Sequence, residues 1–539
     1  MTVHVCRLIA SAYLCVACLP APGQLNSTAL TQLQKATVRI SVPGGGVSSG
    51  VVITPTSEIL TASHSIPEGP GEIQVRLPGQ GVRTAVLVER DVQADIALLR
   101  LQPGTPAPGG TQPAPSSAWL PLSPTDPAPN EILLALGYPA RESSTQPPAI
   151  RLGTVRSADP TVVRTSCMLT VGDSGGPLIN RFGQLSGLHR RIGVGPESNQ
   201  HVAPQALKKL LRQANLQQPP QAPAQPPLWQ TTPAWQPSPQ VLRQVASSTL
   251  ELVPHPSSTE VLGLATRLDP RFASAKLSLL QPGQPLYGRF SDGSVRQLQL
   301  VRSNPATDLA ILECTDWHSL PPCGSLPTSS AQTGEIVFAA AGLATAGNPC
   351  RIVGPGVITR VDYTEPAVSP RLGIQLQEQP EQSGLRVLEA APGGAAAAGG
   401  LQRGDLLLSL NQNPIPSLKL LTHHLGPYQP GDWITLNYLR SAEKGQASLR
   451  VGHDPAVMFD RLEYLDGRAG VVSIRRTGFQ GVLQHDLVLD PKECGGLLIS
   501  SEGQIVGWNV ARRARESSLG LPLQVLQDEL RKAAESAPM

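Results

Sequence analysis

The chain has 539 residues, with 43 Lys and Arg against 40 Asp and Glu and a formal net charge of +3 at pH 7. This length exceeds what one hydrophobic core supports and predicts three or four domains, while the balanced charge, without a run of one sign, argues against a basic surface that would gather nucleic acid. The 54 prolines and 51 glycines, with only 4% aromatic residues, favour short strands joined by turns over long helices.

The N-terminal residues follow the pattern of a secretory signal. Arg7 precedes the apolar stretch LIASAYLCVACL, and small residues at 21–23 suit cleavage by a signal peptidase. The stretch has about twelve apolar residues, whereas spanning a bilayer takes about twenty. We therefore expect residues 1–23 to be a signal peptide and the mature protein to be exported, to the periplasm or the extracellular space. Cys18 partly matches a lipoprotein acylation site, so attachment to a membrane as a lipoprotein stays an alternative.

The cysteines beyond the signal are five in number, so they cannot all pair within the chain; they are Cys167, Cys314, Cys323, Cys350 and Cys494. Cys314 and Cys323 are close enough in sequence to close a short disulfide loop in an oxidising compartment. No Cys or His spacing matches a metal site, and the sequence predicts neither a metal nor a cofactor.

Three short stretches in the first half carry the residue types of nucleophilic catalysis. They read SGVVITPTSEILTASHSI (49–66), ADIALLRL (94–101) and VGDSGGPLIN (171–180). A serine hydroxyl is nearly inert at neutral pH unless a base that titrates near pH 7 lies within hydrogen-bond reach, and imidazole is that base. A carboxylate must then hold the imidazole in the right tautomer. The pattern predicts Ser174 as nucleophile, His64 as general base and Asp95 as the orienting carboxylate.

Together these stretches resemble the trypsin-like serine proteases, and most closely the HtrA/Deg family, over residues 30–214. The resemblance implies a chymotrypsin-type double β-barrel. It also implies that the oxyanion hole is formed by the backbone N–H groups of Gly172 and Ser174. PQALKKLLRQANL, which ends this part of the chain, matches the short C-terminal helix of such domains.

The same resemblance places Met168, six residues before the nucleophile, at the base of the primary specificity pocket. A flexible apolar side chain there predicts a preference for an aliphatic residue before the scissile bond. Arg190 and Arg191, on the strand expected to form the pocket wall, could alter that preference.

A second copy of the pattern follows a proline-rich stretch at 215–240, which is expected to be an extended, semi-rigid linker. Residues 74–101 align without gaps with 287–314 at a constant offset of 213 residues. Asp308 then occupies the aspartate position, but Leu277 replaces the histidine.

The nucleophile loop of this second copy has also changed. At an offset of 320 residues, Cys494 takes the position of Ser174 and Lys492 takes that of Gly172. A thiol without an imidazole partner lacks the proton acceptor that cysteine proteases use. His485 precedes Cys494 by nine residues, and we expect it on a strand face that cannot reach the thiol. The second copy is therefore predicted to be an inactive pseudoprotease.

A module is inserted within this second copy, because the offset between the copies rises from about 203 at Gly356 to 320 at Cys494. Residues 369–453 resemble a PDZ domain through SPRLGIQLQE, GLRVLEAAPGGAAAAGGLQRGDLLLSLNQNPI and SLKLLTHHLGPYQPGDWITLNYLR. The resemblance implies that a peptide adds as a strand beside residues 373–376.

The terminal carboxylate of the bound peptide would accept hydrogen bonds from the N–H groups of Leu372, Gly373 and Ile374. The last side chain of the peptide would contact Leu372, Ile374 and Leu421. A PDZ fold that serves only as a spacer is the alternative.

The predicted fold class is mainly β, with two chymotrypsin-like double β-barrels in tandem, the second carrying an inserted PDZ domain. The predicted segments are a signal peptide (1–23), an active protease domain (24–214), the linker (215–240), the first part of the pseudoprotease (241–368), the PDZ domain (369–453) and the second part of the pseudoprotease (454–539).

The predicted function is that of an exported serine endopeptidase acting through a Ser-His-Asp acyl-enzyme mechanism, with the PDZ module and the pseudoprotease recruiting substrate or regulating access. Its predicted partners are protein or peptide substrates and C-terminal peptides at the PDZ groove, and assembly into a homo-oligomer is left open. A non-catalytic scaffold built on protease-like barrels is the alternative, although retention of His64, Asp95, Gly172 and Ser174 together argues against it. A third reading is a protease whose resting site is malformed until peptide is added.

Overall fold

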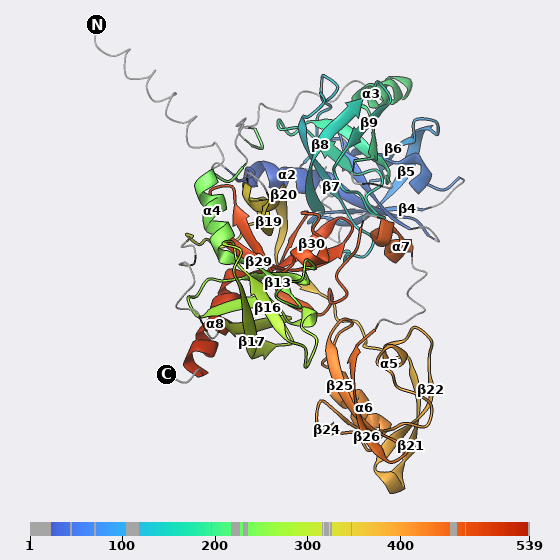
Figure 1. The fold of residues 1–539 in the computed structure, drawn as a ribbon. Helices are drawn as coiled ribbons and strands as arrows, with labels where there is room; N and C mark the ends of the chain where they lie inside the picture. The colour runs from blue at the N-terminus through green and yellow to red at the C-terminus, as the bar shows by residue number, and fades with distance from the viewer. Residues whose placement is uncertain are drawn as a thin grey trace, which may run out of the picture. The chain divides into compact units, whose positions relative to one another are not determined.

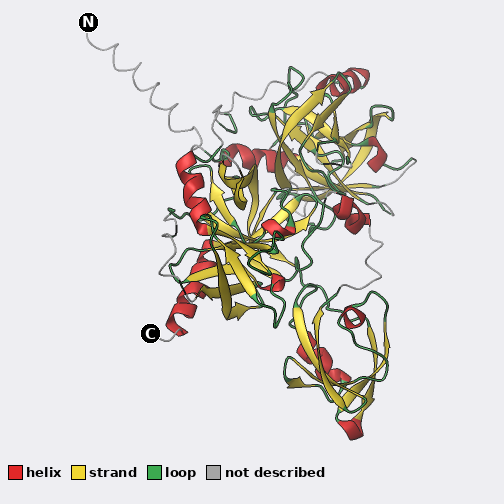
Figure 2. Cartoon of the chain, in the orientation of Figure 1, coloured by secondary structure: helices red, strands yellow, loops and turns green. Residues whose placement is uncertain are grey.

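The computed structural model describes residues 23–536 apart from 44–45, 69–71, 104–117, 194, 196, 217–226, 230–235, 315, 317–322, 324–325, 346–347, 453–460 and 469. The predicted signal, with Cys18, therefore lies outside the described residues except for Gly23. The chain divides into two compact units, the first comprising residues 1–236, 332–337 and 355–360 and the second comprising 237–331, 338–354 and 361–539. Figure 2 shows that both are mainly β, with short helices.

The first unit holds two closed six-stranded barrels (Figure 1). The first barrel has the order β1-β2-β3-β6-β5-β4, with β1 (Thr37–Ser41), β2 (Val47–Val52), β3 (Glu58–Thr61), β4 (Ile73–Leu77), β5 (Gly81–Asp91) and β6 (Ile96–Leu101). The second has the order β7-β8-β9-β12-β11-β10, with β7 (Ile132–Gly137), β8 (Ala149–Ala158), β9 (Val162–Thr165), β10 (Pro177–Ile179), β11 (Leu185–Arg191) and β12 (Asn199–Val202).

Strand patterning explains why these segments close into barrels. In β4 the side chains alternate between buried and less buried positions, as expected for a strand with one face on a core. Val38, Val52 and Leu99 from three different strands belong to the core of the first barrel, while Leu133 and Val163 belong to that of the second. Helix α2 (Ser27–Ala36) begins with an Asn cap, and α3 (Pro204–Gln213) follows β12, where the sequence predicted a closing helix.

The expectation that the whole segment 215–240 is an unpacked linker is wrong at two places. Leu228 and Trp229 are buried within the first unit, and the Leu228 N–H donates to the carbonyl of Arg181 at 2.7 Å. Helix α4 (Pro239–Ser248) begins inside the segment, with Ser238 as its N-cap. Two buried apolar side chains thus fix part of the segment 215–240 to the first unit, although the high proline content of this segment predicted an extended, unpacked chain.

The strand order of the first unit is repeated by strands within residues 249–522, which belong to the second unit except for residues 336–337 and 355–360. One closed barrel has the order β13-β14-β15-β18-β17-β16, formed by β13 (Thr249–Val253), β14 (Gly263–Thr266), β15 (Phe272–Lys276), β16 (Leu286–Arg289), β17 (Val295–Asn304) and β18 (Leu309–Cys314). The other has the order β19-β20-β27-β30-β29-β28, formed by β19 (Ile336–Thr345), β20 (Asn348–Glu365), β27 (Phe479–His485), β28 (Leu497–Ser500), β29 (Ile505–Ala514) and β30 (Ser517–Pro522). Helices α7 (Arg461–Arg468) and α8 (Leu523–Ser536) complete this part, α8 directly after β30.

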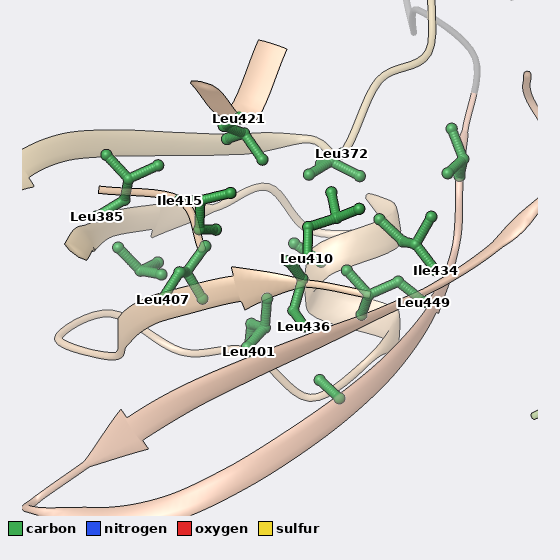
Figure 3. Packing of buried hydrophobic residues seen from close by; sticks show 14 residues of the cluster. Leu372, Leu385, Leu401, Leu407, Leu410, Ile415, Leu421, Ile434, Leu436 and Leu449 are labelled. Carbon is green, nitrogen blue, oxygen red and sulfur yellow. The ribbon is translucent and has the colours of Figure 1, made fainter. Parts of the chain in front are cut away.

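A separate antiparallel sheet lies between β20 and β27 in sequence. Its order is β21-β22-β23-β25-β26, with β24 paired to β23, and its strands are β21 (Ile374–Gln379), β22 (Gly384–Ala390), β23 (Leu406–Leu410), β24 (Asn413–Pro414), β25 (Trp433–Arg440) and β26 (Glu443–Arg450). Helices α5 (Ala395–Ala398) and α6 (Leu418–Leu425) accompany it. Figure 3 shows its apolar core, with Leu372 and Leu421 on the same side of the cluster.

No helix among the described residues is both long and apolar enough to cross a bilayer.

Candidate active site

His64, Asp95 and Ser174 lie together in the first unit. His64 is in a single 3-10 turn (Ser63–Ser65) after β3, Asp95 immediately precedes β6, and Ser174 lies in the loop before β10. His64 Nδ1 lies 2.8 Å and 3.0 Å from the two carboxylate oxygens of Asp95, and His64 Nε2 lies 3.1 Å from Ser174 Oγ. One imidazole thus bridges the hydroxyl and the carboxylate, within hydrogen-bond reach of both.

The backbone around Asp95 fixes its carboxylate. Asp95 has a left-handed φ of +62°, which turns the chain sharply into β6. Its Oδ1 also accepts the backbone N–H of His64 at 2.9 Å, so the carboxylate is held by the main chain as well as by the imidazole. Pairing of Thr61 with Ala97 sets the register of β3 against β6 and brings these neighbouring turns side by side. With the Nδ1 proton donated to Asp95, the lone pair of Nε2 faces Ser174.

The residue before the nucleophile forms a buried ion pair. Asp173 Oδ2 accepts from Arg151 Nη1 at 2.7 Å and from the Thr170 N–H at 2.7 Å. The side chains of Arg151 and Asp173 are 2% and 1% exposed. Arg151 comes from β8, so the strand wall of the second barrel holds the loop that carries Ser174. No sequence pattern had indicated Arg151 as part of this site.

Gly172 is a position that requires glycine. Its φ is +100°, and a Cβ there would lie 2.6 Å from the Ala140 nitrogen and closer still to the Tyr138 carbonyl. Its carbonyl accepts from Ser49 Oγ at 2.8 Å, and the same hydroxyl accepts from the Tyr138 N–H at 2.9 Å. Ser49, on β2, therefore ties the nucleophile loop to the first barrel.

The orientation of the peptide between Val171 and Gly172 bears on the oxyanion hole. The Val171 carbonyl accepts the N–H of Ala140 at 2.7 Å. Because a trans peptide directs its C=O and N–H to opposite sides, the Gly172 N–H points away from Ala140. Within the described residues, neither this N–H nor that of Ser174 donates to a backbone carbonyl. Both amides are therefore available to an incoming oxygen.

Met168, the predicted base of the specificity pocket, is buried, and its sulfur lies 3.9 Å from the side-chain nitrogen of Asn199. Arg190 donates to the Gln93 carbonyl at 3.1 Å, which directs its side chain toward the turn before Asp95.

Two further histidines lie beneath the nucleophile loop. His189 and His201 are buried, with their Nδ1 atoms 2.9 Å apart, and the His189 carbonyl accepts the Gly175 N–H at 2.8 Å. Burial lowers the pKa of both, that of His201 to about 3, so both rings are neutral near pH 7. These two neutral side chains therefore pack behind the nucleophile loop, which the His189 carbonyl holds through the Gly175 N–H.

The aligned aspartate of the second unit has a different partner. Asp308 Oδ2 lies 2.8 Å from the ammonium of Lys276, and its two oxygens accept from the N–H and hydroxyl of Ser278. Lys276 precedes Leu277, which stands where the first unit has histidine. The Lys276 ammonium thus neutralises the Asp308 carboxylate. Because leucine occupies the aligned histidine position, this carboxylate has no imidazole to orient there.

The two amides aligned with the predicted oxyanion donors already form hydrogen bonds in the second unit. The Lys492 N–H donates to Asp490 Oδ1 at 2.9 Å, and the Cys494 N–H donates to the Pro491 carbonyl at 3.3 Å. Residues Pro491–Glu493 form a 3-10 turn closed by an Asp cap. The loop therefore offers no pair of free donors.

Cys494 itself is fully buried, and this burial raises the pKa of its thiol. His485 is buried on β27, where burial lowers its pKa to about 4. The one side-chain group of the described residues in hydrogen-bond reach of the sulfur is the Ser473 hydroxyl, at 3.9 Å. The thiol thus lacks both exposure and a base.

The residues predicted to bind a peptide terminus lie together in the separate sheet. Leu372 and Leu421 are buried in one apolar cluster, and Ile374 packs against it. Gly373 has a left-handed φ of +65°, and a Cβ there would lie 3.0 Å from the Cα of Gly394. β21 is at the end of the strand order, paired with β22, so its other edge is unpaired within this sheet. An unpaired edge strand beside an apolar cluster is the arrangement that accepts an added strand.

Cys314 and Cys323 are free thiols in the structure, so the disulfide considered from their spacing is not formed. Among the described residues, no group of three or more His, Cys, Asp or Glu side chains could hold a metal ion.

Comparison with known proteins gives two domain matches. Residues 48–188 match the trypsin-like peptidase domain family, and residues 364–437 match the PDZ domain family. The first match includes His64, Asp95 and Ser174, and the second includes residues 372–374 and Leu421. The chain thus contains a trypsin-like peptidase domain and a PDZ domain.

Several curated proteases are similar to parts of the chain. Serine protease HTRA2, mitochondrial, of Bos taurus is 32% identical over 150 residues, 26% of this chain and 30% of the relative. Periplasmic serine endoprotease DegP of Escherichia coli K12 is 27% identical over 106 residues, 20% of this chain and 22% of the relative.

A longer match is to a protein named Probable periplasmic serine endoprotease DegP-like, of Pseudomonas savastanoi pv. phaseolicola, which is 25% identical over 402 residues, 70% of this chain and 72% of the relative. The chain therefore spans less than a third of HTRA2 and DegP but most of the DegP-like protein. These findings show a chain with a trypsin-like peptidase domain and a PDZ domain that is similar to HtrA-type serine proteases.

Proposed function

We propose that the protein is a serine endopeptidase in which Ser174, His64 and Asp95 form the catalytic triad. The observation that carries this proposal is the geometry of the imidazole, with Nε2 at 3.1 Å from the Ser174 hydroxyl and Nδ1 at 2.8 Å from Asp95. Histidine in this position takes the hydroxyl proton as the oxygen attacks a carbonyl, and the carboxylate stabilises the imidazolium that results.

The reaction follows from this geometry. Ser174 Oγ attacks the peptide carbonyl carbon, His64 accepts the proton, and the Gly172 and Ser174 N–H groups receive the negative oxygen. His64 then protonates the leaving amine, and the C–N bond breaks to leave an acyl-enzyme. Water, deprotonated by His64, attacks the acyl carbon and releases Ser174. A buried Met168 favours an aliphatic side chain before the cleaved bond.

The second unit is proposed to be a degenerate copy of the first, which would make the fold two double β-barrels in tandem with the PDZ domain inserted in the second. The repeated strand order supports this proposal, as does the position of the PDZ sheet between β20 and β27. Lys276 on the aligned aspartate and the occupied amides of Lys492 and Cys494 support its inactivity. In this scheme the second unit and the PDZ domain recruit substrate or regulate access to Ser174.

Export is part of the proposal. It is supported by the N-terminal sequence pattern, with lipoprotein attachment at Cys18 as its variant, and by relatives named as periplasmic endoproteases.

Labelling with a fluorophosphonate probe tests the catalytic proposal. The probe forms a covalent bond with a serine only where a base activates it. We expect one labelled residue per chain, and we expect Ser174→Ala to abolish labelling without changing the thermal unfolding profile. Ser473→Ala, which removes the hydroxyl near Cys494, is the matched control and should label normally. Absence of labelling in folded protein, with or without added peptide, would favour the scaffold alternative.

Peptide binding by the PDZ domain is a second prediction. Replacing Leu421 by alanine removes apolar surface beside Leu372 and should weaken binding of a peptide with a free, apolar C-terminus about tenfold or more. Fluorescence anisotropy with a labelled peptide measures this loss. Leu388→Ala, on an exposed strand position of the same sheet, is the control and should bind as the parent does. Equal affinity in the Leu421 variant would show that the PDZ domain is a spacer.

A further inference from the structure

A cavity of about 450 Å³ lies in the second unit. Its wall is largely apolar and includes Leu262, Leu279, Val472 and Ile474. Val471, also on its wall, is 70% exposed, and Ile474 is 44% exposed. Exposed apolar side chains gathered around a concavity mark a binding site more often than a packing defect.

The cavity lies beside the positions that align with the catalytic residues of the first unit. Lys276, which lines it, directly precedes the leucine aligned with His64. Lys492, which also lines it, aligns with Gly172. The second unit therefore keeps a hollow where the first would receive a peptide, but with a lysine at the place of an oxyanion donor.

The charged side chains on the cavity wall differ in whether they already form ion pairs within the protein. The Lys276 ammonium is used by Asp308, whereas Lys492 is exposed and forms no ion pair within the described part of the chain. Arg450 donates to the carbonyls of Ser278 and Gly431 and faces no carboxylate in an ion pair. Glu260 is the acidic residue of the wall. Two carboxylates beside the wall, Asp308 and Asp432, act on Arg450, and Asp432 also pairs with Arg475, a further cation of the wall. The four cations (Lys276, Arg450, Arg475 and Lys492) still exceed the three carboxylates (Glu260, Asp308 and Asp432) by one, so the cavity favours an anionic ligand with an apolar body.

We propose that this cavity binds the free C-terminus of a peptide, with the last apolar side chain inside and the terminal carboxylate at the Lys492 ammonium. The bound peptide is not cleaved, because the Lys492 and Cys494 amides are used within the loop and the thiol is buried. Cleavage by the first unit creates new carboxylate termini, which would make its products ligands of the second unit. Only this last step rests on the proposed function.

Binding to the full chain carrying Ser174→Ala and Leu421→Ala tests the proposal, because these substitutions remove cleavage and weaken the PDZ site. The probe is an N-terminally fluorescent peptide ending in Leu-Val-Leu, made as the free acid and as the C-terminal amide. Fluorescence anisotropy should show the acid binding about tenfold to a hundredfold more tightly, the range for one hydrogen bond to a charged group. Lys492→Glu in this background should abolish the preference for the acid.

Lys444→Glu, the same charge change at an exposed position of β26, is the matched control and should leave binding unchanged. Because Lys492 is exposed, its variant should unfold at the parental temperature, which a thermal melt checks. Equal affinity for acid and amide, or an unaltered preference in Lys492→Glu, would overturn the proposal. Acid-selective binding in this background, together with a parent chain (Ser174 intact) that folds but fails to react with fluorophosphonate, would instead refute the catalytic function and leave this site standing.

Discussion

Asp95→Asn is expected to lower kcat about 10⁴-fold with little change in KM. An asparagine amide that donates to Nδ1 would stabilise the wrong imidazole tautomer, with the proton on Nε2 facing Ser174. The neutral amide would also no longer stabilise the imidazolium that forms during attack. Steady-state hydrolysis of a peptide substrate ending in a chromogenic amide measures the loss, with protein concentration corrected by the folded fraction.

Asp308→Asn is the matched control, because Asp308 occupies the same position in the second unit. It should leave kcat per folded molecule unchanged, since its carboxylate faces Lys276 and no imidazole. The Lys276 ammonium would then be buried without its counterion, so this control should unfold at a lower temperature. A large fall in kcat from Asp308→Asn, with Asp95→Asn nearly normal, would reverse the assignment of the two units.

The proposed catalytic constellation could be predicted from the sequence because its parts are locally encoded. GDSGGP specifies a glycine with left-handed φ before a serine, and Gly172 has that φ in the structure. The apolar runs before His64 and after Asp95 predicted strands, and β3 and β6 pair in a register that brings the two residues together. Short segments with strong patterns are thus sufficient once the order of the barrel strands is known from the resemblance.

What the sequence did not predict depends on partners far apart along the chain. The absence of a histidine at the aligned position was visible as Leu277, but the pairing of the Lys276 ammonium with Asp308 was not, because lysine at a strand end is usually solvated. Similarly, the lysine at 492 indicated a missing glycine, but only the structure shows its amide donating to Asp490. Leu228 and Trp229 were overlooked for the opposite reason, since the surrounding prolines and glutamines dominate the composition there.

Arg151 is the clearest case of a long-range partner. In AIRLG it is one charge within an apolar strand, and nothing local indicates that it meets Asp173, 22 residues further on. Burial of both side chains makes their pairing obligatory, because an unpaired charge in such a place is strongly destabilising. The second unit has a related but more exposed pair, Arg351 with Glu493, at 2.6 Å. Both loops are therefore held from a barrel strand, and only the first is held by a buried pair.

Arg151→Met is expected to lower the stability of the first unit by about 3 to 5 kcal/mol, because it leaves the Asp173 carboxylate buried without this cation. Release of the loop should also displace the Gly172 and Ser174 amides, and losing one oxyanion donor costs about 10² to 10³ in kcat. Denaturant unfolding followed by fluorophosphonate reactivity measures the first effect, and hydrolysis at saturating substrate measures the second.

Arg351→Met provides the comparison, since the Arg351 side chain is 54% exposed and solvent screens its pairing with the buried Glu493, so its loss costs less than that of the fully buried Arg151. It should leave both unfolding and kcat nearly unchanged. Combining Arg151→Met with Asp173→Asn also removes the negative charge at residue 173, so part of the lost stability should be recovered. We expect kcat to stay low, because the neutral asparagine amide can accept only part of the hydrogen bonds that the carboxylate accepted. Recovery of kcat together with stability would show that the pair acts through folding alone, whereas recovery of stability without kcat would assign it to positioning of the nucleophile loop.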